Sequence, residues 1–157
     1  MRLTDLLTPE RVAIHPDQNG EPLDKAGAIR ELAQMLAQGT RVNGGEVARV
    51  LMDREQLQST GIGEGVAIPH GALLQLDTQH AGLLIVPHGI DFAAIDGHSV
   101  NIIFAVIGPK RATGEHLKTL ARVSRLLRNR TFRERLVAAS SAKDAHDLIV
   151  AEEGERP

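Results

Sequence analysis

Residues 59–70 read STGIGEGVAIPH, and this stretch determines how the rest of the chain is interpreted. Three alternating glycines are followed by a short β-branched run, a proline and a histidine. Dinucleotide-binding and P-loop motifs place a glycine-rich turn directly before a helix, because the helix N-terminus supplies the N–H groups that hold the phosphate. Here the glycines lead into VAIP, where Pro69 biases Ile68 toward an extended conformation, and no Lys-Ser or Lys-Thr pair follows. We therefore predict a short strand that ends at His70, and no nucleotide site.

The composition limits the classes of fold and partner that fit this chain. Its 157 residues suit one domain with a buried core, and we predict a single domain over residues 1–157, with residues 152–157 as a flexible tail. Lys and Arg number 18 against 20 Asp and Glu, a net charge of −2, so no overall field attracts nucleic acid or anionic lipid. Trp and Tyr are absent, which leaves three Phe for stacking on bases. We expect no nucleic-acid partner.

Cysteines and long apolar segments are both absent. The lack of Cys excludes disulfides, thiolate metal sites and thiol nucleophiles. No run of about 18 apolar residues occurs, so we expect no membrane insertion and take the cytoplasm as the default location. Five histidines form neither an H-x-x-x-H nor an H-E-x-x-H unit, so we interpret them as surface residues and predict no metal site: His15, His80, His88, His98 and His146.

Hydrophobic periodicity predicts two helices before the glycine stretch. Over residues 24–38 the apolar side chains recur at i, i+3, i+4 and i+7, and Gly39 follows as a stop signal. The sequence NGGE predicts a second helix from Asn43 to about residue 56, with Asn43 as its N-cap and Glu46 completing a capping box.

Strands and further helices follow along the chain. Beyond Gly108 a helical pattern returns with Thr113 as its cap, TFRE at Thr131 forms a capping box, and Ser141 starts a last short helix. Helices that precede and follow a group of strands predict an α/β layered domain with a mixed sheet. Three β-branched runs bounded by Gly or Pro predict the buried strands: residues 66–68, 82–87 and 100–108.

His70 is the candidate reactive residue, although a lone loop histidine is more often ordinary surface than chemistry. Its neighbours therefore decide the interpretation. Arg54 lies sixteen positions upstream at the end of the second predicted helix, and Ser59 and Thr60 place two hydroxyls at the start of the loop. These residues together offer the elements of an anion site, with the hydroxyls either contacting a phosphoryl group or holding the loop.

The sequence resembles the IIA phosphocarrier domains of the bacterial phosphoenolpyruvate-dependent phosphotransferase system, of the fructose and mannitol type, including their nitrogen-regulatory branch. The STGIG-x-G-x-AIPHG signature is long and specific, and with the LLTPERV opening the resemblance covers nearly the whole chain. The matching stretches are RE at Arg54 and Glu55, residues 59–71, GIDF at 89–92, DG at Asp96 and Gly97, and HLKTL at 116–120.

This resemblance implies a fold, a site and partners. The fold is an α/β domain with a mixed sheet of about five strands between helices. His70 would accept a phosphoryl group on Nε2 from an HPr-type carrier, with Arg54 and His116 completing the site. A IIB protein or a regulated target protein would be the next partner, and the phosphotransferase activity would need no cofactor.

The chemistry of the three residues fits this assignment. A neutral imidazole offers a nitrogen lone pair near pH 7, and an arginine can hold two phosphoryl oxygens with a bidentate fork. If Thr113 caps its helix, His116 is the third residue of that helix, where the dipole favours a neutral ring. A close approach by a partner's phosphohistidine would explain the glycines beside His70.

Three alternatives stay open at this point. A chain with no attached membrane or second phosphotransfer domain favours the nitrogen-regulatory branch, against a sugar-specific IIA component that hands phosphate to a IIB protein. A third alternative is a protein-binding regulatory module in which phosphate only selects the surface presented. A basic stretch over residues 118–135 could dock an acidic partner, although a solvated face is the preferred interpretation.

Overall fold

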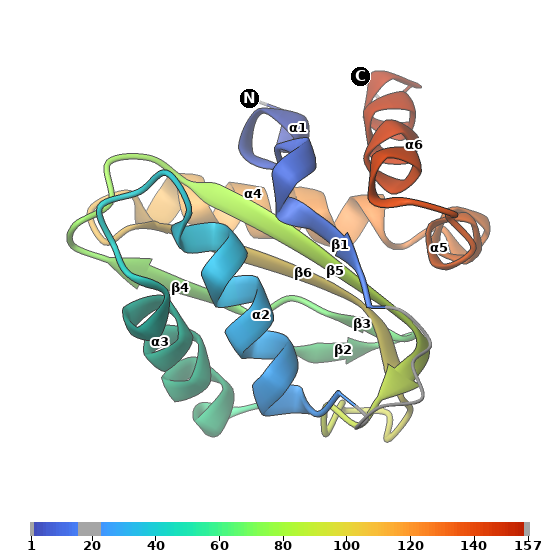
Figure 1. The fold of residues 1–157 in the computed structure, drawn as a ribbon, viewed down its shortest axis with the longest axis horizontal. Coiled ribbons are helices and arrows are strands. Elements are labelled where there is room, and N and C mark those ends of the chain that lie inside the picture. The colour runs from blue at the N-terminus through green and yellow to red at the C-terminus, as the bar shows by residue number, and fades with distance from the viewer. Residues whose placement is uncertain (1, 16–22, 156–157) are drawn as a thin grey trace.

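The computed structural model describes residues 2–15 and 23–155 and contains one six-stranded mixed sheet, which confirms the predicted fold class with one strand more than expected (Figure 1). The strand order is β1-β5-β6-β3-β2, with β4 also paired to β6. Within this part of the chain the sequence missed three short strands, β1, β2 and β4. The strands are β1 (Val12–Ile14), β2 (Gly61–Gly63), β3 (Val66–Ala67), β4 (His70–Leu73), β5 (His80–Ile90) and β6 (Val100–Pro109).

The central strand β6 explains why the sheet carries helices on both faces. Its side chains alternate between two buried clusters, as the period of two in a strand requires. Ile103, Ala105 and Ile107 point to one cluster, whereas the intervening residues 102, 104 and 106 point to the other. Because both faces of β6 are apolar, the strand has to be covered from both sides.

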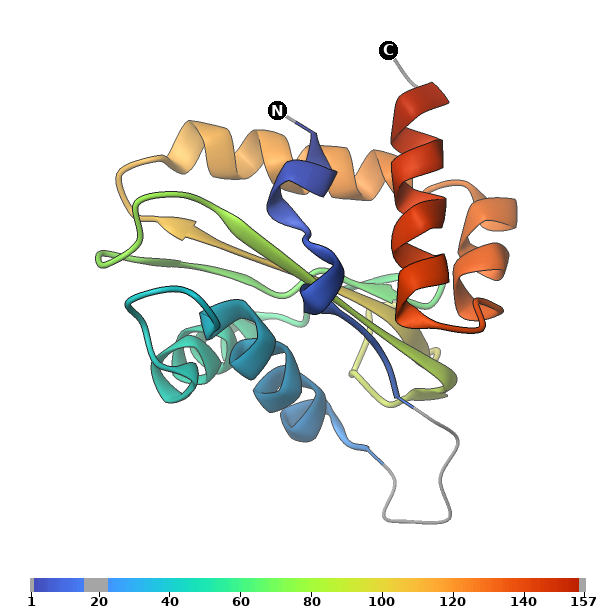
Figure 2. The ribbon, with the colours of Figure 1, turned by 45° about the horizontal axis from the view of Figure 1, so that its top comes forward.

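Helices cover the two faces unequally (Figure 2). Two helices, α2 (Lys25–Ala37) and α3 (Gly44–Leu57), pack on one face. Four others supply side chains to the cluster on the opposite face: α1 (Leu3–Leu6), α4 (Thr113–Leu126), α5 (Arg130–Val137) and α6 (Ala142–Glu155). A short 3-10 turn, η1 (Pro9–Arg11), connects α1 to β1. None of the helices in the described ranges is long and apolar enough to cross a membrane.

Of the five predicted helix starts, three are confirmed and two, at Thr113 and Thr131, are wrong. Asp24, Asn43 and Ser141 each accept a hydrogen bond from a backbone N–H of the first turn that follows. Glu46 bonds to the side-chain amide of Asn43. The capping box at Thr131 does not form, because Asn129 caps α5 by accepting from the N–H of Phe132 at 3.0 Å. Asn is a stronger cap, so the helix begins earlier.

The C-terminal segment is ordered further than the sequence predicted. Helix α6 continues to Glu155, so residues 152–155 of the predicted flexible tail are helical, and residues 156–157 lie outside the described part. The carboxylate of Glu153 accepts the N–H of Leu3 at 2.7 Å and of Thr4 at 2.9 Å. It thereby caps the N-terminus of α1, where a negative charge is stabilising. This long-range contact could not be found from the local pattern.

The strand that carries His70 does not end there, which corrects the first expectation. β3 and β4 both run parallel to β6 in one register, Ala67 beside Ile103 and His70 beside Val106. The two therefore form one strand that is interrupted at Ile68 and Pro69. Pro has no N–H to donate to the ladder, so an interruption is expected at this position. His70 is the first residue after the break.

The glycines of the motif serve the packing of the protein itself. A Cβ on Gly61 would meet the backbone of Ala94 at 2.9 Å, and one on Gly71 would meet Val50 Cγ1 at 2.4 Å. Gly63 and Gly65 have φ of +97° and +78°, in the left-handed region that glycine adopts most readily. These internal constraints account for all four glycines, so the space predicted for a partner is not needed to explain them.

Replacing Gly71 by Ala should reduce the free energy of unfolding by about 1–3 kcal/mol, because the added methyl group collides with the stiff, β-branched Val50. Urea unfolding followed by circular dichroism measures the loss. Gly114→Ala is the matched control, since nothing lies within 4 Å of a Cβ there. Equal stability of Gly71→Ala and wild type would contradict the packing explanation.

Candidate functional site

An open pocket of about 240 Å³ gathers four of the five predicted site residues. Arg54 comes from the last turn of α3, Ser59 and Thr60 from the segment between α3 and β2, and His70 from the start of β4. The sequence missed five further lining residues, which come from α4, β2 and the neighbouring loops: Gln58, Ile62, Ile68, Leu120 and Ser124. His116 is not among the lining residues, but its ring centroid lies 5.7 Å from that of His70.

The ring of His70 is held in one tautomer. Its Nδ1 lies 2.7 Å from the backbone carbonyl oxygen of Ile68, two residues earlier. A carbonyl oxygen only accepts hydrogen bonds, so Nδ1 carries the proton and donates it. In the neutral ring Nε2 is then unprotonated and has its lone pair available. The ring of the half-buried His70 therefore leaves Nε2 as the nitrogen available for nucleophilic chemistry.

Arg54 is fixed beside the same pocket. Its Nη1 donates to the carbonyl oxygen of Gln58 at 2.8 Å, which satisfies one free carbonyl at the C-terminal end of α3. A cation is also stabilised at that end of a helix by the helix dipole. The guanidinium has five N–H donors, so several stay available after this contact to hold an anion in the pocket.

His116 occupies a different helical position from the predicted one. Ala112 is the N-cap of α4 and Thr113 is the first helical residue, so His116 is the fourth and its N–H bonds to the carbonyl oxygen of Ala112. Burial, and secondarily the neighbouring His70, lower the pKa of His116. A neutral ring follows, as the sequence predicted, but burial is the main cause.

The hydroxyls of Ser59 and Thr60 are already engaged within the protein. Ser59 Oγ donates to the carbonyl oxygen of Phe92 at 2.9 Å, and Thr60 Oγ1 donates to the carboxylate of Glu55. Either hydroxyl would have to break this bond to donate to a ligand. Of the two predicted roles, holding the loop is the one that the geometry favours.

Glu55 is an organising residue that the sequence analysis did not single out. It is 5% exposed, and its carboxylate accepts the N–H and the hydroxyl of Thr60 and pairs with Lys25 Nζ at 2.8 Å. Lys25 also donates to the carbonyl of Phe92 and lies 4.6 Å from the centre of its ring. The motifs RE, ST and GIDF are thus linked through one buried charge, which only the three-dimensional contacts reveal.

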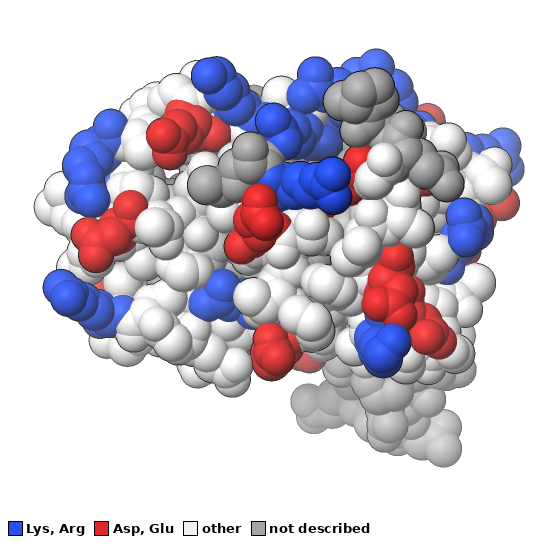
Figure 3. Space-filling model, turned by 90° about the horizontal axis from the view of Figure 1, so that it is seen from above, with Lys and Arg blue, Asp and Glu red and all other residues white. Residues whose placement is uncertain are grey.

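The basic stretch over residues 118–135 does not form one continuous patch. Arg133 is buried, and its guanidinium donates to the carbonyls of Leu127 and Arg128 and pairs with Glu64. Arg130 pairs with Glu134 on α5. Figure 3 shows Lys and Arg interspersed with Asp and Glu on the face seen from above. These contacts favour the interpretation of residues 118–135 as a largely solvated face over their interpretation as a docking patch for an acidic partner.

Within the described ranges, no group of three or more His, Asp or Glu side chains is arranged to hold a metal ion. Three of the histidines predicted at the surface are instead partly buried: His15, His80 and His146. His80 Nδ1 lies 2.9 Å from Arg11 Nη1, and His146 Nε2 bonds to the carbonyl oxygen of Leu7. Their bonds tie the N-terminal segment to β5 and α6.

Comparison with known proteins gives consistent matches. The family model described as phosphoenolpyruvate-dependent sugar phosphotransferase system, EIIA 2, matches residues 6–152. A protein named nitrogen regulatory protein from Bradyrhizobium diazoefficiens is 36% identical over 149 residues, which cover 95% of each chain. The crystal structure of nitrogen regulatory protein IIA-Ntr from Neisseria meningitidis has a TM-score of 0.84 and 29% identity, over 94% of this chain and 98% of that one.

A more distant match is the NMR structure of a complex between mannitol enzyme IIA and phosphorylated mannitol enzyme IIB from Escherichia coli. The matched chain has a TM-score of 0.72 at 20% identity and is covered over 99% of its length, against 93% of this chain. At this identity the likeness concerns the fold.

The low pKa of His116 makes the stability of the protein depend on pH. The folded-state pKa lies below the ordinary value of 6.5, so the unfolded chain takes up the proton first as the pH falls. The free energy of unfolding should therefore decrease as the pH drops below about 6.5 and level off below the folded-state pKa. Urea unfolding between about pH 7.5 and pH 5 should show a shallower decrease for His116→Gln than for wild type. Identical slopes would contradict a neutral, buried ring.

Proposed function

The chain belongs to the EIIA type 2 family of the phosphoenolpyruvate-dependent sugar phosphotransferase system, and we propose that it is a phosphohistidine carrier that is transiently phosphorylated at His70. The donor is the phosphohistidine of an HPr-type protein. The carrier state acts in regulation, and onward transfer to a IIB protein is the second candidate. The single observation that carries the proposal is the bond from His70 Nδ1 to the Ile68 carbonyl, since it leaves Nε2 as the nucleophile.

The transfer is an in-line displacement at phosphorus. His70 Nε2 forms the new N–P bond while the N–P bond of the donor breaks, and the electron pair of that bond stays on the donor's imidazole. The transition state spreads negative charge over the equatorial oxygens, so the protein contributes alignment and positive charge. Arg54 lines the pocket of His70 and supplies N–H donors for these oxygens.

His116 completes the site from α4. Its ring is tilted by 54° against that of His70, and its low pKa keeps it neutral near pH 7. A neutral imidazole with its proton on Nε2 donates one hydrogen bond to a phosphoryl oxygen without adding a full charge. This moderate stabilisation suits a carrier, because the phosphoryl group has to leave again.

The surface around the pocket suits a protein partner. Ile62 lines the pocket and is 50% exposed, while Leu57 and Leu117 on α3 and α4 are 83% and 61% exposed. Leu57 and Leu117 are the chain neighbours of Gln58 and His116, and exposed apolar side chains near a polar site are typical of surfaces that bind proteins. A phosphohistidine on another protein is therefore the proposed donor.

A regulatory role is favoured over a dedicated sugar-uptake role. The Bradyrhizobium relative and the Neisseria structure both have nitrogen-regulatory names and match this chain over nearly its full length. The mannitol IIA complex supports the second candidate, because in it a protein of the same fold is bound to a phosphorylated IIB protein. Adding candidate IIB proteins to the phosphorylated chain separates the two, since only the second candidate loses its phosphate to them.

His70→Ala should abolish phosphorylation. The experiment incubates the chain with phosphoenolpyruvate, enzyme I and an HPr-type carrier, and measures acid-labile phosphate by intact-protein mass spectrometry and acid treatment. Wild type should gain one phosphoryl group that acid removes. The matched control His98→Ala changes an exposed histidine and should be phosphorylated like wild type. Acid-labile phosphate on His70→Ala would remove His70 from the proposal.

Arg54→Lys should slow phosphoryl transfer by about 100-fold, because an ammonium cannot reproduce the fork of donors that a guanidinium offers. Rapid-quench kinetics with a phosphorylated HPr-type donor measures the rate. Arg49→Lys is the matched control, since Arg49 is exposed on the same helix. Equal rates for Arg54→Lys and Arg49→Lys would show that Arg54 does not contact the phosphoryl group.

A further inference from the structure

Two buried side-chain atoms have no hydrogen-bond partner in the described part of the chain, and they belong to two residues that both lie beside Gly108. They are Nδ1 of His116 and Oε1 of Gln79. Gln79 is 7% exposed and directly precedes β5. Most buried polar atoms in proteins are paired, and leaving one unpaired costs about 1–3 kcal/mol. Two such atoms beside a proposed reactive residue therefore require an explanation.

Gly108 on β6 brings the two residues together. A Cβ built on Gly108 would lie 3.1 Å from Gln79 Cγ and 3.5 Å from His116 Nδ1. The antiparallel register that pairs His80 with Ile107 also places Gln79 beside Gly108. The absence of a side chain at Gly108 thus leaves room in which the amide of Gln79 and the ring of His116 approach each other.

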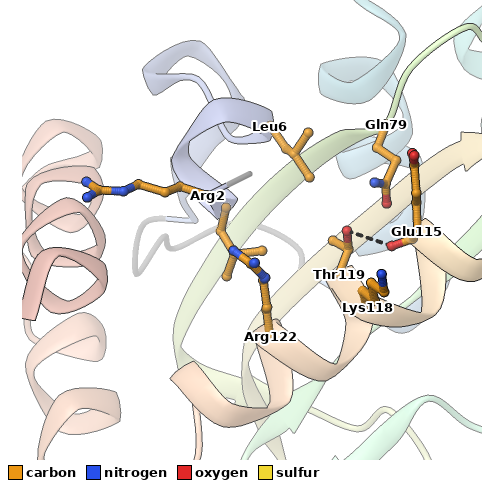
Figure 4. Close-up of a pocket in the computed structure, with 8 residues that line it drawn as sticks. Arg2, Leu6, Gln79, Glu115, Lys118, Thr119 and Arg122 are labelled. Carbon is orange, nitrogen blue, oxygen red and sulfur yellow. Dashed lines mark hydrogen bonds between the residues drawn. The ribbon is translucent and has the colours of Figure 1, made fainter. Parts of the chain in front are cut away.

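The amide of Gln79 is also accessible from a second pocket, of about 260 Å³, between α1 and α4. Figure 4 shows Gln79 with its amide directed toward α4, near Glu115 and Thr119. Thr119 Oγ1 donates to the carbonyl oxygen of Glu115, so this hydroxyl is already used. A half-turn of the terminal torsion of a glutamine exchanges the positions of its amide oxygen and nitrogen, so either atom can face His116.

We propose that Gln79 is a positioning residue that donates an N–H of its amide to Nδ1 of His116, directly or through one bridging water, and so fixes the proton of His116 on Nε2. The proposal rests on the proposed function for its consequence, which is a His116 that donates to the phosphoryl group on His70. The geometry of Gln79, Gly108 and His116 stands by itself.

The direction of this hydrogen bond follows from what each ring nitrogen has to do. A phosphoryl oxygen only accepts, so the nitrogen of His116 that meets it must carry a proton. Burial keeps the ring neutral, so the other nitrogen is an acceptor. Nδ1 faces Gly108 and Gln79 and is that acceptor. It needs a donor, and glutamine supplies one, whereas a carboxylate would impose the opposite tautomer.

The tautomer of His116 is the direct test. Long-range ¹H–¹⁵N correlation spectra of the free protein distinguish a protonated from an unprotonated ring nitrogen. Wild type should show the proton on Nε2. Gln79→Met keeps the length of the side chain without the amide and should give a mixture of the two tautomers. Gln79→Glu supplies only an acceptor and should move the proton to Nδ1 and raise the pKa of His116.

The kinetic consequence is measured separately. Gln79→Met should lower the rate of phosphoryl transfer to His70 by about tenfold, the lower end of the effect usually seen for residues that orient a reactive histidine. Gln75→Met makes the same change at an exposed glutamine of the preceding turn and should leave both spectrum and rate unchanged. Circular dichroism and thermal unfolding confirm that each variant is folded.

Each outcome decides the proposal. A wild-type His116 with its proton on Nδ1, or an unchanged tautomer ratio in both Gln79 variants, would overturn it. A wild-type chain that shows the expected tautomer but accepts no phosphate on His70 would instead contradict the proposed function and leave the role of Gln79 intact. If the Gln79 variants change the tautomer of His116 but not the rate of phosphoryl transfer, Gln79 sets the tautomer only in the free protein. That result would overturn its proposed role in positioning His116 for the transfer.

Discussion

The break at Pro69 is the constraint on which the reactive centre depends. Without it, residues 66–73 would form one regular strand along β6, since the register is the same on both sides. At the break the carbonyl oxygen of Ile68 accepts from the ring of the residue that follows the proline. The missing backbone N–H of Pro69 therefore coincides with the bond that orients His70 and leaves Nε2, the nitrogen that we propose to react, unprotonated.

The surroundings of His70 are held in place by a set of contacts that do not involve its ring. Glu55 holds Thr60 and Lys25, and Lys25 and Ser59 both bond to the carbonyl of Phe92. A buried carboxylate requires such complete pairing, because an unpaired charge in the interior is strongly destabilising. Two faces of the sheet contribute to the site, with Arg54 coming from α3 and His116 from α4 on the opposite side.

Much of this architecture was accessible from the sequence, and the remainder depends on contacts that the sequence does not reveal. Helix α2 follows from hydrophobic periodicity and strand β6 from a β-branched run that ends at Gly108, and both are local signals. The short strands β1 and β2 are defined by their pairing with β5 and β3, so no local pattern predicts them. The candidates His70 and Arg54 came from the motif, whereas the contacts of Glu55 and the role that we propose for Gln79 needed the fold. Thr113 and Thr131 were wrong as caps because neighbouring residues begin those helices.

The bond between the two ends of the chain has a practical consequence for handling the protein. Glu153 in α6 caps α1, and Leu3 and Leu6 of α1 form part of the wall beside Gln79. Helix α1 thereby connects the last helix to the surroundings of Gln79. Purification tags or fusion partners that pull on the C-terminal helix would loosen this wall, so they are better removed before kinetic work.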